Sequence, residues 1–387
     1  MQETPLISII MPCYNCATIL REAFHSIYRQ NFTSPFEVVM VDDGSTDTTL
    51  ETIKSLIADR PECQLIRHEH NKGGGAARNT AVKASKGEII FCLDSDDVLA
   101  DNSLPPMIEF LQKESLDGAI FKHRRFFSSD TTKYEEVSNP DVSREILISD
   151  IFESTEKRIL FNNFVHTKKA YETAGGYPED HGFDTQEFEY KFLAKNLKSK
   201  ICPNSIYYHR QAIQKSYFDR EYEKGLFSIN TYLALEPILE YLSDGIIDLC
   251  VQFDITTKNE LKNENNLLGA ISKQYINDGT MLFAGNERSA RCKAFIEASS
   301  LLRDGQYDEA LLKLENCGKL YGEVTPLLLF NITRARHGSS GTPKVKVIDE
   351  TLQWFQNCGI LKARKMRRLP SPILKLYLLC KTLFLGK

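Results

Sequence analysis

The sequence has 387 residues, a formal net charge of -4 and 42% hydrophobic residues. This length is enough for a large buried core and for two or more domains. The slightly acidic balance argues against a protein that binds nucleic acid through general basicity, so we expect no nucleic-acid partner.

The amino-terminal run MQETPLISII enters a strand-like pattern at once and lacks the basic and apolar segments of a signal peptide. The ten cysteines are scattered and lie mostly in apolar runs, which is typical of reduced core residues in a cytosolic protein. Cys13 and Cys16 form a C-x-x-C pair, but no second pair follows at zinc-binding spacing. We therefore expect a cytoplasmic protein in which these cysteines belong to the core.

Strand-like apolar runs alternate with helix-like runs in the first half of the sequence. The helix-like runs include CATILREAFHSIYRQ and DTTLETIKSLIADR, which separate successive strands. Such alternation predicts an α/β fold with a mainly parallel sheet flanked by helices. The strand-like runs are residues 6–12, 36–43, 63–69, 88–96 and 118–127.

From about residue 217 the strand pattern fades, and Leu, Glu, Lys and Ala recur at helical spacing. We expect an α/β domain at residues 1–214, a helical linker region at 215–262 and a helical domain at 263–387. The segment GQYDEALLKLENC (305–317) has the pattern of a helical repeat, although one unit is equally compatible with a plain helical bundle.

Polar residues follow each of the first four predicted strands. In an open parallel sheet, ligands bind beyond the carboxyl ends of the strands, so these clusters are expected to share one rim. The clusters are Pro12–Asn15, Asp42–Asp47, His70–Asn79 and Asp94–Asp97.

Two of these clusters also have a purely structural interpretation. The run DDGSTD can cap a helix, because Ser, Thr and Asp are favoured at helix N-caps, but capping leaves Asp42 and Asp43 unexplained. In NKGGGAARN the glycines allow the backbone to approach a ligand closely, and Arg78 adds a fixed positive charge. The run matches neither the P-loop nor the dinucleotide-binding pattern, which argues against a kinase or a dehydrogenase.

The run DSDD at residues 94–97 places several acids at the end of a buried strand, where like charges repel. Mg²⁺ is usually held by one or two carboxylates together with substrate phosphates. An Asp-x-Asp at a strand end therefore predicts a site for a metal diphosphate complex. The same residues are also compatible with an ordinary exposed acidic turn.

Together, ISIIMPCYN, VVMVDDGSTD, NKGGGAARN and IIFCLDSDD resemble, in this order and spacing, the inverting glycosyltransferases of family 2, of the bacterial surface-polysaccharide type. The resemblance covers roughly residues 5–212. It implies a GT-A fold with a Rossmann-like nucleotide-binding half. It also implies a nucleotide-sugar donor, usually a UDP-sugar, with Mg²⁺ or Mn²⁺ and transfer to an acceptor hydroxyl on a saccharide or a lipid-linked molecule.

The same resemblance implies roles for residues of the first three clusters. Pro12, Cys13 and Tyr14 would line the nucleotide pocket. Asp43 would contact the uracil, and Arg78 would lie near the base or the ribose.

At the fourth cluster, the resemblance places Asp94 and Ser95 beside the ribose and diphosphate and makes Asp96 the metal ligand. Asp97 is a neighbour without an assigned role. The run IYYHRQ resembles the closing strand of the family, where His209 would join the metal or the diphosphate unless it is structural.

Inversion by single displacement needs a carboxylate that takes the proton of the acceptor hydroxyl. The segment at 175–196 resembles the part of the family in which a Glu-Asp pair opens a helix and the Asp is the base. Here the pair reads Phe183-Asp184, so Asp184 is the expected base. Glu187 or Asp180 would take its place if the register differs, and Asp184 would otherwise be only an N-cap.

The basic run KARKMRR precedes an apolar carboxyl-terminal stretch that Lys375 and Lys381 interrupt before it reaches the ~18 residues of a membrane span. Residues 362–387 are therefore expected either to lie on an anionic membrane surface, at the inner face of the cell membrane, or to dock as a helix on the helical domain.

The sequence thus predicts a metal-dependent inverting glycosyltransferase. Two alternatives stay open at this point. A non-catalytic, glycosyltransferase-like scaffold acting through the helical domain is compatible with the altered acid at Phe183. A sugar nucleotidyltransferase would share the fold class and a metal diphosphate site, but no glycine-rich loop ending in Arg and Lys follows the first strand.

Overall fold

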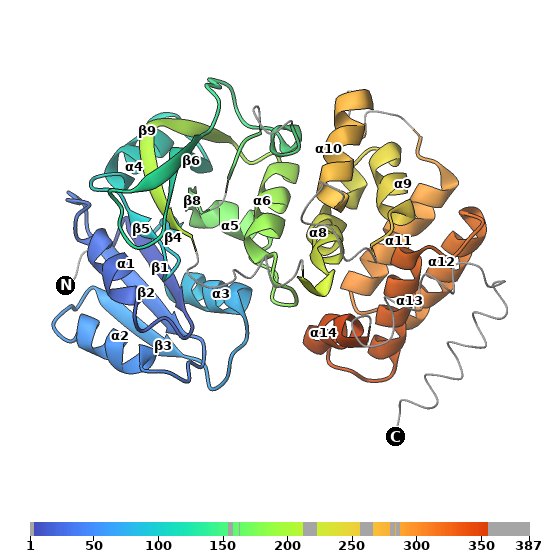
Figure 1. The fold of residues 1–387 in the computed structure, drawn as a ribbon, viewed down its shortest axis with the longest axis horizontal. Coiled ribbons are helices and arrows are strands. Elements are labelled where there is room, and N and C mark those ends of the chain that lie inside the picture. Colours follow the sequence, from blue (N-terminus) through green and yellow to red (C-terminus); the bar gives the residue numbers. More distant parts are fainter. Residues whose placement is uncertain are drawn as a thin grey trace. The chain divides into compact units, whose positions relative to one another are not determined.

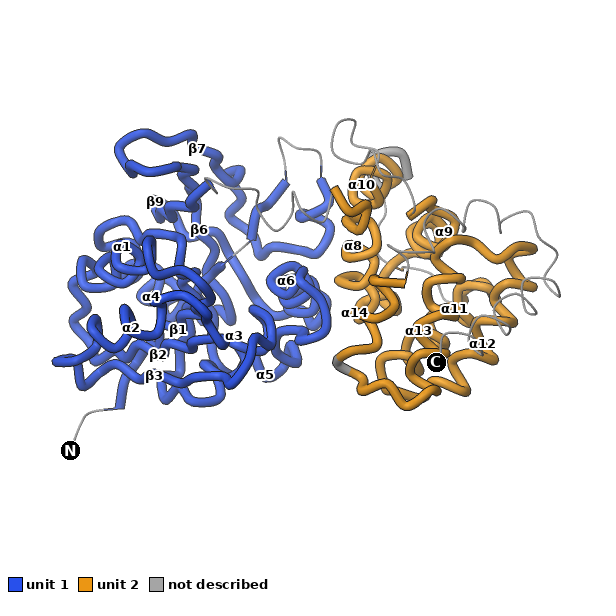
Figure 2. Tube along the Cα trace, turned by 60° about the horizontal axis from the view of Figure 1, so that its bottom comes forward, with its two compact units in different colours: residues 1–216 blue, residues 217–387 orange. Residues whose placement is uncertain are grey.

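The computed structural model describes residues 4–153, 158–161, 163–211, 223–255, 266–278, 283 and 287–354. The chain divides into two compact units, residues 1–216 and residues 217–387 (Figure 2). The predicted boundaries at 214 and 262, and the roles assigned to the three predicted regions, stay predictions.

The first unit is built on one mixed sheet, labelled in Figure 1. Its parallel half has the order β3-β2-β1-β4, and β8 then joins β4 antiparallel before β6, β9 and β5 complete the sheet. The strands are β1 (Ile7–Cys13), β2 (Phe36–Asp42), β3 (Cys63–Arg67), β4 (Ile89–Cys92), β5 (Val98–Leu99), β6 (Gly118–Phe127), β7 (Tyr134–Ser138, paired with β6), β8 (Val165–Thr167) and β9 (Ser199–Arg210).

Helices cover both faces of this sheet, and this explains why its central strands are continuous apolar runs. Ile9 and Met11 of β1 belong to a core that includes residues of α1, α2 and α4. Ile10 lies between them and points to the other face, on which α3 packs. The helices of this unit are α1 (Leu20–Ile27), α2 (Thr49–Ile57), α3 (Gly74–Ala84), α4 (Leu104–Lys113), the short η1 (Ile148–Ile151), α5 (Lys168–Ala174) and α6 (Asp184–Ala194).

The described elements of the second unit are all helical. A buried network stabilises them, because Arg334 pairs with Glu236 at 2.8 Å and Tyr232 donates to the same carboxylate at 2.8 Å. The elements are α8 (Phe227–Leu235), η2 (Glu236–Tyr241), α9 (Asp244–Gln252), α10 (Leu267–Asp278), α11 (Ala290–Arg303), α12 (Tyr307–Leu320), α13 (Pro326–Ser339) and α14 (Lys344–Trp354). The predicted fold class, a mixed and mainly parallel α/β sheet followed by an all-α region, is confirmed.

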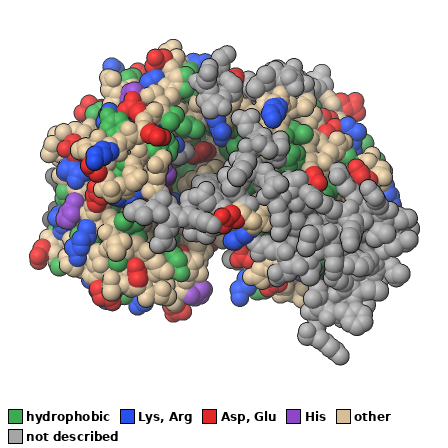
Figure 3. Space-filling model, in the orientation of Figure 1, with side chains coloured by type: hydrophobic (Ala, Val, Ile, Leu, Met, Phe, Trp, Pro, Cys, Tyr) green, Lys and Arg blue, Asp and Glu red, His purple; other side chains and the backbone are tan. Residues whose placement is uncertain are grey.

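Within the described ranges, no helix is both long and apolar enough to cross a membrane. The predicted surface-binding tail at 362–387 lies outside the described residues. On the visible face of the first unit, acidic and basic side chains are interspersed and no large area of one sign appears (Figure 3).

Candidate active site

The ends of β1 and β2 are joined at the rim where the first two polar clusters lie. Cys13 and Asp42 are paired in the parallel register, and the Asp43 backbone N–H donates to the Cys13 carbonyl at 2.8 Å. Asn15 adopts a left-handed conformation (φ 49°), which Asn tolerates better than most residues, and its Oδ1 accepts the Thr46 N–H at 2.9 Å. The Asn15 side chain, for which no role was predicted, therefore connects the two loops.

The three residues predicted to line the nucleotide pocket differ in exposure. Tyr14 is 47% exposed and Pro12 is half-buried, whereas Cys13 is buried. The Cys13 thiol donates to the Met11 carbonyl at 3.6 Å, on the core side of the sheet. Cys16 is also a buried free thiol, in agreement with core cysteines. The Cys13 side chain therefore faces the core, and only the backbone of Cys13 lies at the rim.

Asp43 organises the glycine-rich turn that follows β3. Its carboxylate accepts the backbone N–H groups of Lys72 and Gly73, both at 2.9 Å. His68 Nδ1 lies 2.6 Å from the same carboxylate and must donate to it, because a carboxylate only accepts. Asp43 is buried, at 2% exposure. Its Oδ2 can accept one further hydrogen bond.

Arg78 is buried at the start of α3 and connects two separate parts of the chain. One terminal nitrogen donates to Asp184 Oδ2 at 2.5 Å, and the other donates to Asp94 Oδ1 at 2.6 Å. The structure therefore brings together the acid at the end of β4, the arginine of the glycine-rich turn and the acid that opens α6.

Gly74 and Gly75 of the turn have close contacts within the protein. A Cβ on Gly74 would lie 2.8 Å from Asp184 Oδ2, and a Cβ on Gly75 would lie 1.7 Å from the Pro178 carbonyl oxygen. At Gly74 the close neighbours are the side chains of Arg78 and Asp184, and at Gly75 the close neighbour is the Pro178 backbone. The close approach of a ligand to this turn stays a prediction.

Substitution of Gly75 by Ala is expected to lower the transfer rate by about 10²-fold. A displacement of catalytic groups by about 1 Å can reduce a reaction rate by this factor. The new methyl group would overlap a backbone atom, so the Pro178 loop has to move, and Asp184 moves with it. The measurement is the transfer rate beside the melting temperature. Gly318→Ala, where the nearest atom is 3.4 Å away, is the matched control and should keep full activity. Wild-type transfer by Gly75→Ala would show that this packing is dispensable.

Asn79 holds the same loop from the other side. Its Nδ2 donates to the Tyr177 carbonyl at 2.9 Å and to Glu179 at 2.7 Å. Its Oδ1 accepts from the Tyr171 hydroxyl at 2.6 Å and the Tyr177 N–H at 3.0 Å. All four hydrogen bonds of the amide are used, so Asn79 fixes the loop before α6 on α3.

The acids of DSDD have different surroundings. Asp94 accepts from Arg78 and, through Oδ2, from Asn163 at 2.8 Å. Ser95 is half-buried. Neither Asp94 nor Ser95 is completely buried, so both side chains remain open to a ligand at the rim.

Asp97, by contrast, is 1% exposed and fastens the closing strand β9 to the end of β4. It accepts from the Tyr207 hydroxyl at 2.6 Å and from the Arg210 backbone N–H at 2.9 Å, and His209 Nδ1 lies 3.2 Å away. Although burial opposes it, the charge of His209 and these hydrogen bonds hold the pKa of Asp97 below its usual value. Asp97 therefore acts as a structural anchor.

Asp96 is exposed at the surface, yet protein atoms crowd its carboxyl group. This desolvation, together with the charges of Asp97 and Asp94, raises the pKa of Asp96 to about 7. A carboxylate crowded by like charges and open to solvent is well suited to a cation, which would favour its ionised form.

His209 is placed like a metal-binding histidine. Its Nδ1 carries the proton that Asp97 accepts, so in the neutral ring Nε2 is the free acceptor. Metal-ligating histidines commonly have this second contact to a carboxylate. Within the described ranges, no three His, Cys, Asp or Glu side chains form a complete metal cage. Two protein ligands fit Mg²⁺ or Mn²⁺ in a site that the substrate phosphates complete.

Asp184 and Glu187, the two main candidates for the base, differ in their ion pairs. Burial raises the pKa of Asp184, and Arg78 counteracts only part of this effect. Glu187 is held by His181 at 2.8 Å and Lys191 at 2.9 Å, and these partners keep the pKa of Glu187 below its usual value although burial opposes them. Asp180, the third candidate, is half-buried. Only Asp184 touches the arginine that also binds Asp94.

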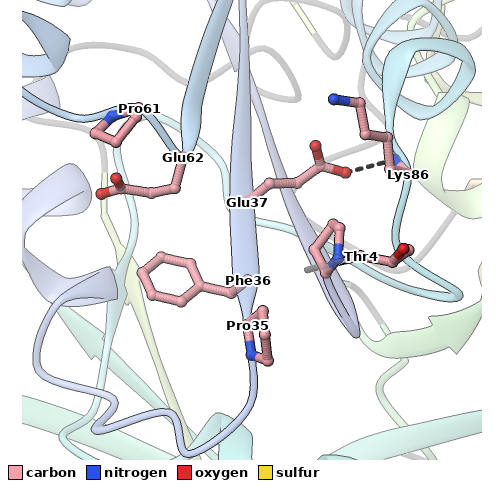
Figure 4. A pocket seen from close by; sticks show the side chains of 8 residues that line it. Thr4, Pro35, Phe36, Glu37, Pro61, Glu62 and Lys86 are labelled. Carbon is pink, nitrogen blue, oxygen red and sulfur yellow. Dashed lines mark hydrogen bonds between the residues drawn. The ribbon is translucent and has the colours of Figure 1, made fainter. Parts of the chain in front are cut away.

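A hollow of about 400 Å³ lies at the opposite, amino-terminal end of β2 (Figure 4). Its polar centre is Glu37, which accepts from the Ser8 hydroxyl at 2.5 Å and from the backbone N–H groups of Lys86 and Gly87. These bonds fasten the turn between α3 and β4. The hollow contains none of the predicted site residues.

Comparison with known proteins shows which proteins this chain resembles. The family described as Glycosyl transferase family 2 matches residues 8–171. Glycosyltransferase GlyG of Streptococcus pneumoniae serotype 4 is 26% identical over 254 residues, which are 62% of this chain and 84% of that protein. Chondroitin synthase of Escherichia coli is 33% identical over 255 residues, 64% of this chain but only 36% of that protein.

Among solved structures, TarS 1-349 of S. aureus in complex with UDP-GlcNAc superposes with a TM-score of 0.50 at 18% identity, covering 90% of this chain and 91% of that chain. This likeness shows a shared fold. The relatives are named glycosyltransferases or synthases, which argues against the nucleotidyltransferase and scaffold alternatives. The family 2 match spans β1 to α5 of the first unit, so this region of the chain is a glycosyltransferase family 2 region, and the chain is a glycosyltransferase.

Proposed function

We propose that this glycosyltransferase is metal-dependent and inverting, and that it moves a sugar from a UDP-sugar to an acceptor hydroxyl. The observation that carries the proposal is the position of Arg78, which contacts Asp94 at the end of β4 and Asp184 at the start of α6. A donor-side acid and a candidate base thereby share one site at the carboxyl ends of the strands, where ligands bind in such sheets.

The donor would lie along this rim. Support for a UDP-sugar comes from TarS, whose structure holds UDP-GlcNAc. The uracil would meet exposed Tyr14 and the remaining acceptor position of Asp43. The ribose and diphosphate would meet Asp94 and Ser95, which stay open to solvent.

Asp184 is proposed as the general base. As a carboxylate it would accept the proton of the acceptor hydroxyl while the oxygen attacks the anomeric carbon of the donor sugar. Burial makes this carboxylate more basic than an exposed one, and Arg78 holds its orientation. Asp96 and Nε2 of His209 would hold the metal. A bound Mg²⁺ or Mn²⁺ would neutralise the negative charge that develops on the leaving diphosphate.

The acceptor is proposed to be a saccharide or a lipid-linked saccharide in cell-surface polysaccharide or glycolipid synthesis. The likeness to chondroitin synthase supports a saccharide acceptor, although this chain spans about a third of that protein. The corresponding place of action is the cytoplasm, at the inner face of the cell membrane, which the basic tail would contact.

Deletion of residues 362–387 is expected to release the protein from anionic lipid vesicles while donor hydrolysis continues. The tail carries the basic run KARKMRR, and each cation near an anionic surface contributes about 1 kcal/mol. Vesicle sedimentation in low salt measures the binding. A full-length protein that stays in the supernatant would contradict the membrane proposal.

The proposed reaction is tested by incubating the protein with a panel of UDP-, GDP- and dTDP-sugars with Mn²⁺ and measuring the released nucleoside diphosphate. We expect release of UDP from at least one UDP-sugar and loss of this release after addition of EDTA. Release that persists in EDTA would refute metal dependence, and release from only a GDP- or dTDP-sugar would refute the UDP assignment.

A further inference from the structure

Arg124 lies in β6, on the same strand face as Phe126, and is only 8% exposed. It is paired in register with Tyr207 of β9, and Phe126 is paired with His209. Tyr207 and His209 both contact Asp97. Arg124 therefore belongs to the part of the sheet that carries the proposed metal ligand.

This guanidinium is buried without a bonded partner. Within the described part of the chain, Arg124 forms no ion pair or hydrogen bond, its Nε is completely enclosed, and its guanidinium carbon lies 5.9 Å from the centroid of the Phe126 ring. Glu189 of α6, Tyr207 and Asp97 attract it only across a distance, and burial lowers the pKa of Arg124. A buried charge is costly unless it is paired, so an unpaired one calls for a partner that arrives from outside.

Other arginines of this unit differ in this respect. Arg125, the next residue, donates to Glu136 at 2.7 Å and to the Tyr208 hydroxyl at 2.9 Å. Arg210 donates to the Asp96 carbonyl at 2.7 Å and to the Ser128 carbonyl at 2.9 Å. Arg125 of β6 and Arg210 of β9 therefore both have hydrogen-bond partners, whereas Arg124 has none among the described residues.

The order of the strands indicates which substrate Arg124 would meet. The proposed nucleotide contacts come from the ends of β1, β2 and β4, whereas β6 follows only after β8. Arg124 is thus farther along the rim than the acids that would hold the diphosphate, on the side where α6 brings Glu189. A donor laid from β2 toward β4, with its diphosphate at a metal held by Asp96 and by His209 of β9, would leave the β6 side next to α6 for the acceptor.

We propose that Arg124 binds a phosphate group of the acceptor substrate. This inference rests on the proposed function, because it places the acceptor relative to a donor at the strand ends. Arginine recognises phosphate by paired, charge-assisted hydrogen bonds, and the guanidinium has the donors to form them. The acceptor class is therefore a phosphate-bearing one, such as a phosphorylated saccharide or a lipid-linked phosphate.

The test uses the full-length protein saturated with UDP and Mn²⁺, so that the donor diphosphate position is filled. Glycerol phosphate is then titrated as a soluble phosphate probe, with glycerol as the neutral control, and binding is measured by calorimetry. Glycerol phosphate should bind and glycerol should not. Arg124→Met should weaken this binding by about 10-fold or more, since hydrogen bonds to charged groups contribute this much.

Arg124→Lys keeps the charge and should retain part of the binding, which controls for misfolding of the methionine variant. Arg125→Met is the matched control on the opposite strand face and should bind glycerol phosphate like the wild type. UDP affinity should be unchanged in all three variants.

Three results would overturn the proposal. Equal weakening of UDP and glycerol phosphate by Arg124→Met would show that Arg124 serves the donor diphosphate. Wild-type protein that binds UDP but ignores glycerol phosphate would show that Arg124 is structural, and the proposed function would stand. Wild-type protein that binds no UDP would contradict the proposed function, and the inference would fall with it.

Discussion

Asp184→Asn is expected to reduce sugar transfer by ~10²- to 10⁴-fold, the contribution of a general base, while affinity for the nucleotide stays close to that of the wild type. The substitution keeps the size of the side chain and removes its basicity. Nucleotide affinity should survive because the proposed nucleotide contacts lie on other elements, at the ends of β1, β2 and β4. Initial transfer rates and calorimetric UDP binding measure the two effects.

Glu187→Gln is the comparison variant and should be milder in transfer, because Glu187 is held by His181 and Lys191 and does not contact Arg78. A reversed order of the two variants would move the base to Glu187. Small, equal effects from both would contradict a base on α6.

The pH profile provides an independent check on Asp184. The base must be deprotonated, so activity is present above its pKa and is lost as the pH falls through it. Because burial raises the pKa of Asp184, this loss should occur at a higher pH than for an ordinary exposed Asp. The acidic limb should be absent from the residual activity of Asp184→Asn.

The second large effect is expected for Asp96→Asn, which should abolish Mn²⁺-dependent turnover and leave the fold intact. The substitution removes one of the two proposed protein ligands from an exposed strand end. Since it also relieves the repulsion from Asp97 and Asp94, we expect an unchanged or higher melting temperature without metal. Turnover and melting temperature, each with and without Mn²⁺, measure these effects.

Asp97→Asn is the informative neighbour, because Asp97 is buried and binds Tyr207 and the Arg210 backbone. This variant should lose stability, whereas Asp96→Asn should lose only metal-dependent activity. If the Asp96→Asn variant turned over at the wild-type rate in Mn²⁺, this would contradict the assignment of Asp96 as a metal ligand.

The parallel half of the sheet could be predicted because β1, β2 and β4 are continuous apolar runs, each followed by polar residues. The direction of a side chain at a strand end was harder to predict. Cys13 continues the strand alternation of Ile9 and Met11 into the core, although the motif that contains it lies at the rim. A strand buried on both faces gives no periodic pattern from which this direction could be read.

Long-range partners were the other unpredictable part. Arg78 and Asp184 are far apart in sequence, and no local pattern shows that they pair. The same is true of Asp97, whose partners come from β9 and make it a structural anchor. Arg124 carries no motif at all, and only its burial without a partner draws attention to it.

The most direct test of the account is the thermal stability of the full-length protein with UDP, with and without Mn²⁺. A ligand that binds only the folded state raises the melting temperature. We predict a rise with UDP and Mn²⁺ together that is much larger than with either alone, and that disappears in Asp96→Asn. A melting temperature that UDP leaves unchanged in the presence of Mn²⁺ would contradict a metal-dependent nucleotide site at the strand ends.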